Sequence, residues 1–145
     1  MSKSSECFQD ILNYEKCDYV IHTACPFMEG LNVDQHKSEI KNYTESTKGL
    51  LQKSIENKNT LKFVMTGSAS SIVGQAPEKD KIYSNPLEWA DIDLITKPNE
   101  RAKILAERQT WARVTKAQND EDSNMKLTTI LPYFMIGPPL IDDHI

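Results

Sequence analysis

The chain has 145 residues, of which 39% are hydrophobic and 26% charged, and its net charge is −4. These values suit one soluble domain with a core of its own and argue against an intrinsically disordered chain. The 17 basic residues are spread along the sequence, so no basic stripe predicts a nucleic-acid or membrane-surface partner. The sequence also lacks a secretory leader, and no apolar run approaches the roughly 20 residues of a membrane span. We therefore expect a cytoplasmic protein, or an organellar protein within a complex, and not a secreted one.

The cysteines predict neither disulfides nor a metal site. Cys7, Cys17 and Cys25 are odd in number, and they form no pattern with the three histidines that has the spacing of zinc ligands. Reduced thiols and no bound metal are the expectation.

The first predicted strand covers residues 19–24, where a mostly apolar, β-rich run is stopped by Pro26. Such a run is typical of a parallel strand that is buried on both faces. A helix is predicted next, near residues 33–57, because apolar and small side chains recur there at helical spacing. Asn32, with Gln35 in capping-box register, suits the start of that helix.

A second strand is predicted at residues 61–66, followed by small residues and then a polar loop that contains Pro77 and Pro86. The second helix, near residues 98–118, carries a broad apolar stripe and starts at Pro98, which suits the first helical turn. A third strand at residues 126–131 is closed by Pro132.

This alternation of strands and helices predicts right-handed βαβ units and an α/β domain with a parallel sheet that occupies the whole chain. In such sheets ligands bind beyond the carboxyl ends of the strands. Residues 22–26, 66–70 and 132–138 are therefore the segments where a site is expected.

Four stretches at or near these strand ends carry a family resemblance. They are His-Thr-Ala-Cys-Pro (22–26), Phe-Val-Met-Thr-Gly-Ser-Ala (63–69), Ala-Lys-Ile-Leu-Ala-Glu-Arg-Gln-Thr-Trp (102–111) and Leu-Pro-Tyr-Phe-Met-Ile-Gly-Pro (131–138). In this order and at these separations the chain resembles the extended short-chain dehydrogenase/reductases, in the branch of dihydroflavonol reductases, cinnamoyl-CoA reductases and fungal carbonyl reductases. The resemblance implies one partial NAD(P)-binding Rossmann-like domain over residues 1–145, without the family's first βαβαβ half and its C-terminal substrate region.

The resemblance also implies a catalytic set. Family members reduce a carbonyl with hydride from NADPH, using a Ser and a Tyr-x-x-x-Lys pair on one helix. Matched residue by residue, Ser68 takes the serine position and Lys103 the lysine position, while Asn99 stands where the tyrosine should be. A carboxamide has no acidic proton to deliver near neutral pH, and loss of a positioned general acid typically removes roughly 10²–10⁴ in rate. Neither Tyr83 nor Tyr133 is spaced to sit beside Lys103.

Cofactor contacts follow from the same resemblance. The residues implied are Ala24, Cys25, Pro26, Thr66, Lys103, Pro132 and Tyr133. The family's Gly-x-x-Gly-x-x-Gly turn for the pyrophosphate is not encoded, because no two of the five glycines (30, 49, 67, 74 and 137) are near enough to form it. We therefore expect NADP to be bound weakly or not at all by this chain alone, and a small carbonyl substrate only if a full-length protein is active.

Each of these residues also has a plain structural interpretation. Asn99 is an ordinary residue for a helix start, and Ser68 a small residue that lets another segment pass closely. Lys103 is equally a solvated helix lysine, Cys25 a small packed residue, and His22 a residue of the core.

Two functional hypotheses remain open. In the first, the chain is a fragment or a degenerate member of the carbonyl reductases and is inactive alone; in the second, it is a non-catalytic structural or accessory subunit of a larger assembly. The first strand should leave an unpaired apolar edge, covered either by Met1–Lys16 or by another polypeptide. A chain that does not fold in isolation is the third possibility.

Overall fold

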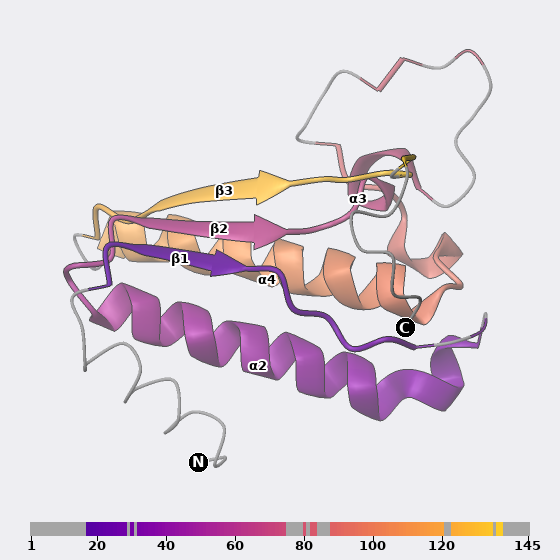
Figure 1. Ribbon diagram of the computed structural model, residues 1–145, viewed down its shortest axis with the longest axis horizontal. Coiled ribbons are helices and arrows are strands. Elements are labelled where there is room, and N and C mark those ends of the chain that lie inside the picture. Colours follow the sequence, from indigo (N-terminus) through magenta and orange to yellow (C-terminus); the bar gives the residue numbers. More distant parts are fainter. Residues whose placement is uncertain are drawn as a thin grey trace.

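The computed structural model describes residues 17–28, 30, 32–74, 80, 82–83, 88–120, 123–134 and 136–137. Within them a three-stranded sheet carries two long helices on one face (Figure 1). The elements in chain order are β1 (Tyr19–His22), the 3-10 helix η1 (Val33–His36), α2 (Lys37–Glu56), β2 (Lys62–Thr66), α3 (Ser70–Val73), the 3-10 helix η2 (Ile92–Leu94), α4 (Pro98–Asp120) and β3 (Lys126–Ile130).

The sheet confirms the predicted α/β class. Its order is β1-β2-β3, and both pairs are parallel. Val20 lies beside Phe63, and Phe63 beside Leu127, so these three side chains point to the same face. All three predicted strands and both predicted helices are present. Apart from the start of the first helix, their ends lie within about two residues of those expected, a normal scatter for helix and strand boundaries.

The start of the first helix differs in detail from the prediction. Residues 33–36 form a 3-10 turn before α2, and the Asn32 side chain accepts a hydrogen bond from the Asp34 N–H at 3.0 Å. Asn32 is thus the cap of this turn. Periodicity did not predict α3 and η2, because each is a single turn too short to show a repeat. The loop residues Pro77 and Pro86 lie outside the described residues.

The core lies between the sheet and the two helices. Phe63 and Met65 on β2 are fully buried, as are Leu51 on α2 and Ile104 on α4. α2 and α4 lie side by side and pack against each other beneath the sheet (Figure 1). Because each right-handed crossover moves the chain one strand in the same direction, both helices reach the same face.

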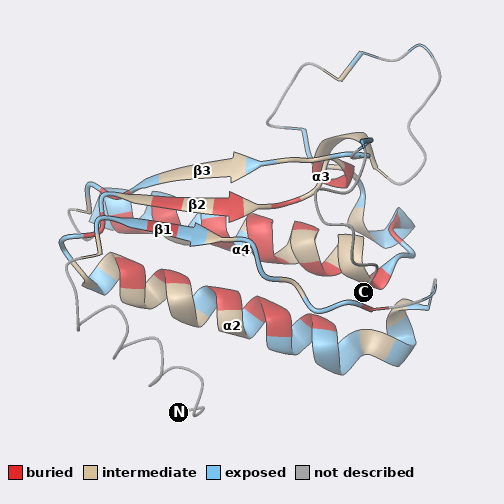
Figure 2. Ribbon diagram, in the orientation of Figure 1, coloured by how far each residue is buried: buried red, intermediate tan, exposed pale blue. Residues whose placement is uncertain are grey.

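The expectation that the first strand is buried on both faces is wrong. Val20 is buried, but Tyr19 and Ile21 are 62% and 69% exposed, and Figure 2 shows the end of β1 and the segment after it as largely exposed. The physical reason is that the described helices cover only one face of the sheet. Among the described strands, β1 pairs with β2 alone and forms an edge of the sheet, as expected.

None of the described helices is both long enough and apolar enough to cross a membrane.

Candidate functional site

The carboxyl ends of the three strands meet at one edge of the sheet, as parallel strands require. The segments after β2 and β3 are joined there by two backbone hydrogen bonds, from Gly67 N–H to Ile130 C=O at 2.8 Å and from Ala69 N–H to Pro132 C=O at 3.0 Å. Two of the three segments where a site was predicted are therefore held side by side.

One face of α4 runs past these strand ends. Asn99, Lys103 and Glu107 are four residues apart and so lie one above another along the helix. Their interactions are with the segments that follow β1 and β2, described in turn below.

Asn99 is fixed to the segment after β1. Its Oδ1 accepts the Met28 N–H at 3.0 Å, and its Nδ2 donates to the Met28 C=O at 3.2 Å. Met28 is buried, so this pair satisfies both backbone groups of a residue that water scarcely reaches. The capping interpretation of Asn99 does not hold, because α4 begins at Pro98 and the carboxamide bonds a distant segment instead. That residue 99 occupies the position of a lost tyrosine stays a prediction.

Lys103, one turn further on, lies near Cys25. Burial raises the pKa of the Cys25 thiol, and the positive charge of Lys103 opposes that rise. Burial is the larger effect, so the thiol stays protonated near neutral pH, which favours the packed interpretation of Cys25 over a reactive one. Lys103 is half-buried and has no ion pair or hydrogen bond with any other residue that the structure describes.

Ser68 lies in the turn between β2 and α3. Its Oγ accepts the Ser70 N–H at 3.3 Å, and its carbonyl accepts the Ser71 N–H at 2.9 Å. The side chain is half-buried, and within the described part of the chain its hydroxyl donates no hydrogen bond. No hydrogen bond joins Ser68 to Lys103 in the described part of the chain.

Glu107 is a residue of this face that the sequence did not single out. It is 2% exposed, and its Oε2 accepts a hydrogen bond of 2.6 Å from the Ser71 hydroxyl, which is fully buried. A Cβ on Gly67 would lie 2.9 Å from the same oxygen and 2.8 Å from Leu131. The absence of a side chain at residue 67 therefore makes room for this buried pair. Its spacing of four residues from Lys103 places Glu107 on this face, but its burial depends on Ser71 and Gly67, which are distant in sequence.

The remaining predicted cofactor residues surround the same edge. Ala24 and Pro26 are exposed, while Thr66 and Pro132 are half-buried. Tyr133 is 59% exposed and packs edge-to-face on Phe134, with ring centroids 4.8 Å apart. The predicted cofactor residues thus lie together at the strand ends. Their binding of a cofactor stays a prediction.

His22 ends β1 and belongs to the packing of α2. Its Nε2 is 2.9 Å from the Thr47 hydroxyl, and its ring contacts Tyr43 and Phe63. Burial lowers the pKa of His22 and raises that of Tyr43 to about 12. Both groups are therefore neutral near pH 7, which agrees with the core interpretation of His22.

Two of the hollows that α2 lines are near the candidate site. The first, of about 620 Å³, is mostly apolar and lies between the end of β1 and the flank of α2 that faces away from α4; its lining includes His22, Cys25, Tyr43, Thr47 and Leu50.

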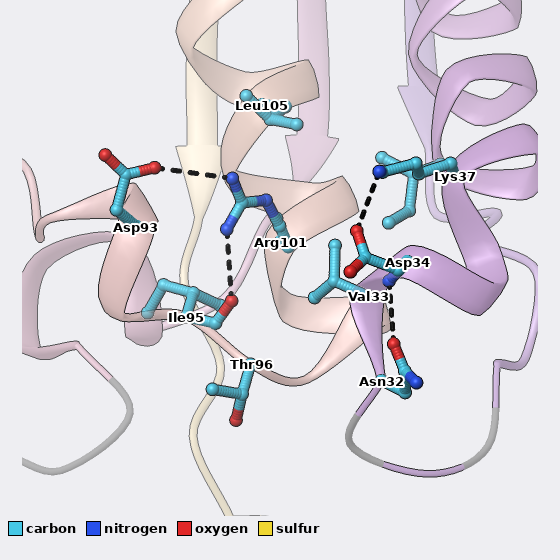
Figure 3. Close-up of a pocket in the computed structure, with 10 residues that line it drawn as sticks. Asn32, Val33, Asp34, Lys37, Asp93, Ile95, Thr96, Arg101 and Leu105 are labelled. Atoms are coloured by element: carbon cyan, nitrogen blue, oxygen red, sulfur yellow. Dashed lines mark hydrogen bonds and ion pairs between the residues drawn. The ribbon is translucent and has the colours of Figure 1, made fainter.

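The second hollow, of about 480 Å³, lies between η1 and the first turns of α4 (Figure 3). Its charged groups already pair with one another: Lys37 with Asp34 at 2.7 Å, and Arg101 with Asp93 at 3.5 Å. Arg101 also donates to the Ile95 carbonyl at 3.3 Å, so these charges have partners without a ligand.

The family resemblance implies a nicotinamide dinucleotide at this edge, and the described residues could hold only one end of it, which stays a prediction. Lys103, with no described partner, and the exposed segment after β1 suit the ribose end of such a cofactor. Neither the short α3 nor the start of α4 at Pro98 follows a glycine-rich turn, so no cradle for the pyrophosphate is seen in the described residues.

Relatives of the chain are reductases. It is 25% identical to an anthocyanidin reductase of Vitis vinifera over an alignment of 133 residues, which covers 88% of this chain and 37% of the relative. It is 29% identical to a dihydroflavonol 4-reductase of Gerbera hybrida, covering 84% of this chain and 32% of the relative. The chain thus spans about a third of the length of these relatives. No protein-family profile matches it.

Solved structures share the fold. A yeast methylglyoxal/isovaleraldehyde reductase complexed with NADPH aligns with a TM-score of 0.68 and 21% identity, over 95% of this chain and 42% of that chain. A GDP-L-fucose synthetase of Naegleria fowleri bound to NADP aligns with a TM-score of 0.59 and 19% identity, over 92% of this chain and 42% of that chain. At these identities the likeness shows the fold alone, which is that of part of a Rossmann-like domain.

Proposed function

Because the chain is related, over part of their length, to the dihydroflavonol and anthocyanidin reductases of the extended short-chain dehydrogenase/reductase family, we propose that it is a fragment or degenerate member of the NAD(P)H-dependent carbonyl reductases. By itself it transfers no hydride. The observation that supports this proposal is the contact made by residue 99, whose carboxamide is bound to the Met28 backbone. By the family resemblance, residue 99 is the position of the proton-donating tyrosine.

The argument from residue 99 is chemical. A carboxamide donates and accepts hydrogen bonds but gives up no proton near neutral pH. Both Asn99 groups are also engaged, since one oxygen and one N–H are spent on Met28. A substrate oxygen beside Ser68 and Lys103 would therefore find a hydrogen-bond donor and a positive charge without a general acid.

The weak fit to the cofactor supports the same conclusion. In the NADP-binding members of this family the pyrophosphate rests on a glycine-rich turn, which this sequence does not contain. We propose that any NADP bound by this chain is held weakly, through Lys103 and the segment after β1, unless more polypeptide supplies the cradle. A small aldehyde or ketone would be the substrate of such a completed protein.

The test is a reductase assay of the purified 145-residue chain. NADPH oxidation is followed with a panel of aldehydes and ketones, and no turnover above the protein-free rate is expected. Turnover that is abolished by Ser68→Ala would contradict the proposal, because it would mean that the serine position and a bound cofactor work together despite Asn99.

A second function, that of a non-catalytic subunit, is favoured by a different observation. Tyr19 and Ile21 are large side chains left 62% and 69% exposed on one face of the sheet, next to the free edge of β1. Such a surface is a liability in an isolated chain and is usually covered. We propose that another polypeptide, or more of the same one, lies on it.

The intact mass and the native mass of the protein from its source separate these cases. An intact mass far above 16.5 kDa means that the chain is a piece of a longer reductase. An intact mass equal to that of this chain, within a complex of defined stoichiometry, favours the subunit. A chain of this mass that is a stable monomer contradicts the subunit proposal.

A further inference from the structure

Ser71 uses all of its polar groups in hydrogen bonds. Its N–H donates to the Ser68 C=O at 2.9 Å, and its C=O accepts the Ala90 N–H at 2.8 Å. Its hydroxyl donates to Glu107 Oε2 at 2.6 Å. Ser71 is fully buried, so water does not readily replace any of these partners. The residue thus joins the turn that contains Ser68 both to the segment at Ala90 and to α4.

Arg108, the next residue of α4, holds the segment at Ala90 as well. Its guanidinium donates to the Ala90 C=O and lies over the Trp89 ring, 5.2 Å from the ring centroid. Glu107 binds Ser71, and Ser71 binds Ala90, so the bond from Arg108 completes a ring of hydrogen bonds. Two segments that are distant in sequence are therefore tied to adjacent residues of one helix.

The turn is fixed from the sheet side too. The N–H groups of Gly67 and Ala69, the residues before and after Ser68, donate to the chain at the end of β3 and just after it. Glu107 reaches this backbone as well, since a Cβ on Gly67 would lie only 2.9 Å from its Oε2. The Glu107 carboxylate therefore meets the turn on both flanks of Ser68.

The position of Glu107 on α4 gives this contact a role at the candidate site. Asn99, Lys103 and Glu107 form one row along the helix, so the bond to Ser71 starts from the row that carries the lysine. Its length sets how far the Ser68 turn stands from that row. A donor stabilises a reacting oxygen at roughly 2.7–3.1 Å, so a small displacement of the turn would cost its effect.

We propose that Glu107 is a positioning residue, which through Ser71 sets the place of Ser68 relative to Lys103. Glu107 touches neither substrate nor cofactor in this role and acts only through the turn. The inference rests on the proposed function in one respect, that Ser68 is the hydrogen-bond donor to a substrate oxygen in a completed protein. It goes beyond that function by adding a residue that the family's catalytic set does not contain.

The reactivity of a thiol at position 68 tests the proposal in the full chain. The chain carries Ser68→Cys, with the natural cysteines Cys7, Cys17 and Cys25 changed to serine. The rate of alkylation by iodoacetamide is followed across the thiol titration, which separates the pKa of the thiol from the limiting rate of the thiolate. The limiting rate reports how firmly the turn is held.

Glu107→Ala should raise this limiting rate by roughly tenfold, because the turn then opens more often. Glu107→Gln keeps an acceptor oxygen and should leave the rate close to that of the chain with Glu107. The matched control is Thr110→Ala, which removes another buried hydroxyl of α4, bonded at 2.8 Å within the helix. It should lower stability without changing the rate at position 68.

Ser71→Ala removes the same hydrogen bond from its other end, and it decides the matter if Glu107→Ala does not fold. It should accelerate alkylation as Glu107→Ala does, and the double variant should be no faster than the faster single one. Circular dichroism and urea unfolding establish that each variant is folded under the assay conditions.

Three outcomes would overturn the proposal. They are unchanged rates in the folded Glu107→Ala and Ser71→Ala variants, an equal acceleration in Thr110→Ala, and a rate in Glu107→Gln as high as that in Glu107→Ala. None of these measurements uses NADPH or a carbonyl compound. Turnover by the chain would therefore contradict the proposed function and leave this inference standing, and a failure here would leave the proposed function standing.

Discussion

The two faces of the sheet are built from the same strands, but the described helices cover only one of them. On the helix side Phe63 and Met65 are fully buried, and on the other side Tyr19 and Ile21 are mostly exposed, although Ile21 is hydrogen-bonded in the same ladder as its neighbours. The strand sequence does not mirror this difference, since Tyr19 and Ile21 are as apolar as a buried face requires. A strand of this composition is adapted to two covered faces, and only one cover is present in the described residues.

The largest expected effect is on catalytic activity, in a fusion that adds the missing N-terminal half beside β1. In a fusion with the glycine-rich N-terminal half of a related reductase, Asn99→Tyr should raise carbonyl reductase activity by roughly 10²–10⁴, because it restores a positioned general acid beside Lys103. The measurement is NADPH oxidation under identical conditions for both fusions. Asn99→Phe is the control, since it has the ring without the acidic hydroxyl. A rise of the same size in Asn99→Phe, or none in Asn99→Tyr, would show that residue 99 is not the tyrosine position.

A pair of truncations measures the difference between the faces directly. Phe63→Ala should lower the free energy of unfolding by about 3–5 kcal/mol, because it leaves a cavity in the core. Ile21→Ala, on the other face of the neighbouring strand, should change it by no more than about 0.5 kcal/mol. Urea unfolding of both variants gives the comparison. A large loss in Ile21→Ala would mean that the exposed face is covered in solution.

The buried polar contact of α4 should give a smaller loss. Glu107→Ala leaves the Ser71 hydroxyl buried without its acceptor, which should cost about 1–3 kcal/mol. Glu107→Gln keeps an acceptor oxygen at the same distance and should cost less. A double-mutant cycle with Ser71→Ala isolates the contact. Strictly additive effects of the two alanine variants would mean that the 2.6 Å hydrogen bond contributes nothing to stability.

The smallest expected effect is a dependence of stability on pH that arises at His22. Burial puts the pKa of His22 in the folded state below its ordinary value of 6.5, so the unfolded chain binds the proton more readily. The stability that neutral His22 contributes is complete above the unfolded pKa and is lost as the pH falls from about 6.5 toward the folded pKa.

The melting temperature should therefore fall between pH 7 and pH 5, and His22→Gln should flatten that fall. The same slope in His22→Gln as in the natural chain would assign the effect to other groups. Lys53 holds the pKa of Glu56, and Lys37 that of Asp34, below their usual values, so these two carboxyls act only at lower pH.

The fold could be predicted well from the sequence, because each strand and long helix has a local sequence signal. Residues 19–22, 62–66 and 126–130 are short β-rich runs bounded by turn residues, and Pro98 marks the first residue of α4. Burial was harder to predict: the apolar run at residues 19–24 does not reveal which face is covered, because that depends on segments distant in sequence. The same limit applied to Glu107, whose burial depends on Ser71 and on the space left at Gly67.

The candidate site was predicted by position rather than by contact. The sequence placed Asn99 in register with Lys103, but no pattern could show that its carboxamide bonds to Met28, 71 residues earlier in the chain. Side-chain to backbone bonds between distant segments leave no periodicity. What residue 99 binds therefore required the structure, and what the site does still requires the assays above.

The bond between Asn99 and Met28 has a consequence for how the protein responds to its surroundings. The carboxamide is a surrogate peptide group, with one donor and one acceptor matched to the N–H and C=O of Met28. It has no group that titrates in the ordinary pH range, so a change of pH does not alter its hydrogen bonds through the charge of Asn99. A tyrosine there would exchange its proton with substrate and solvent. The chain therefore has, between the start of α4 and the segment after β1, a contact that does not titrate.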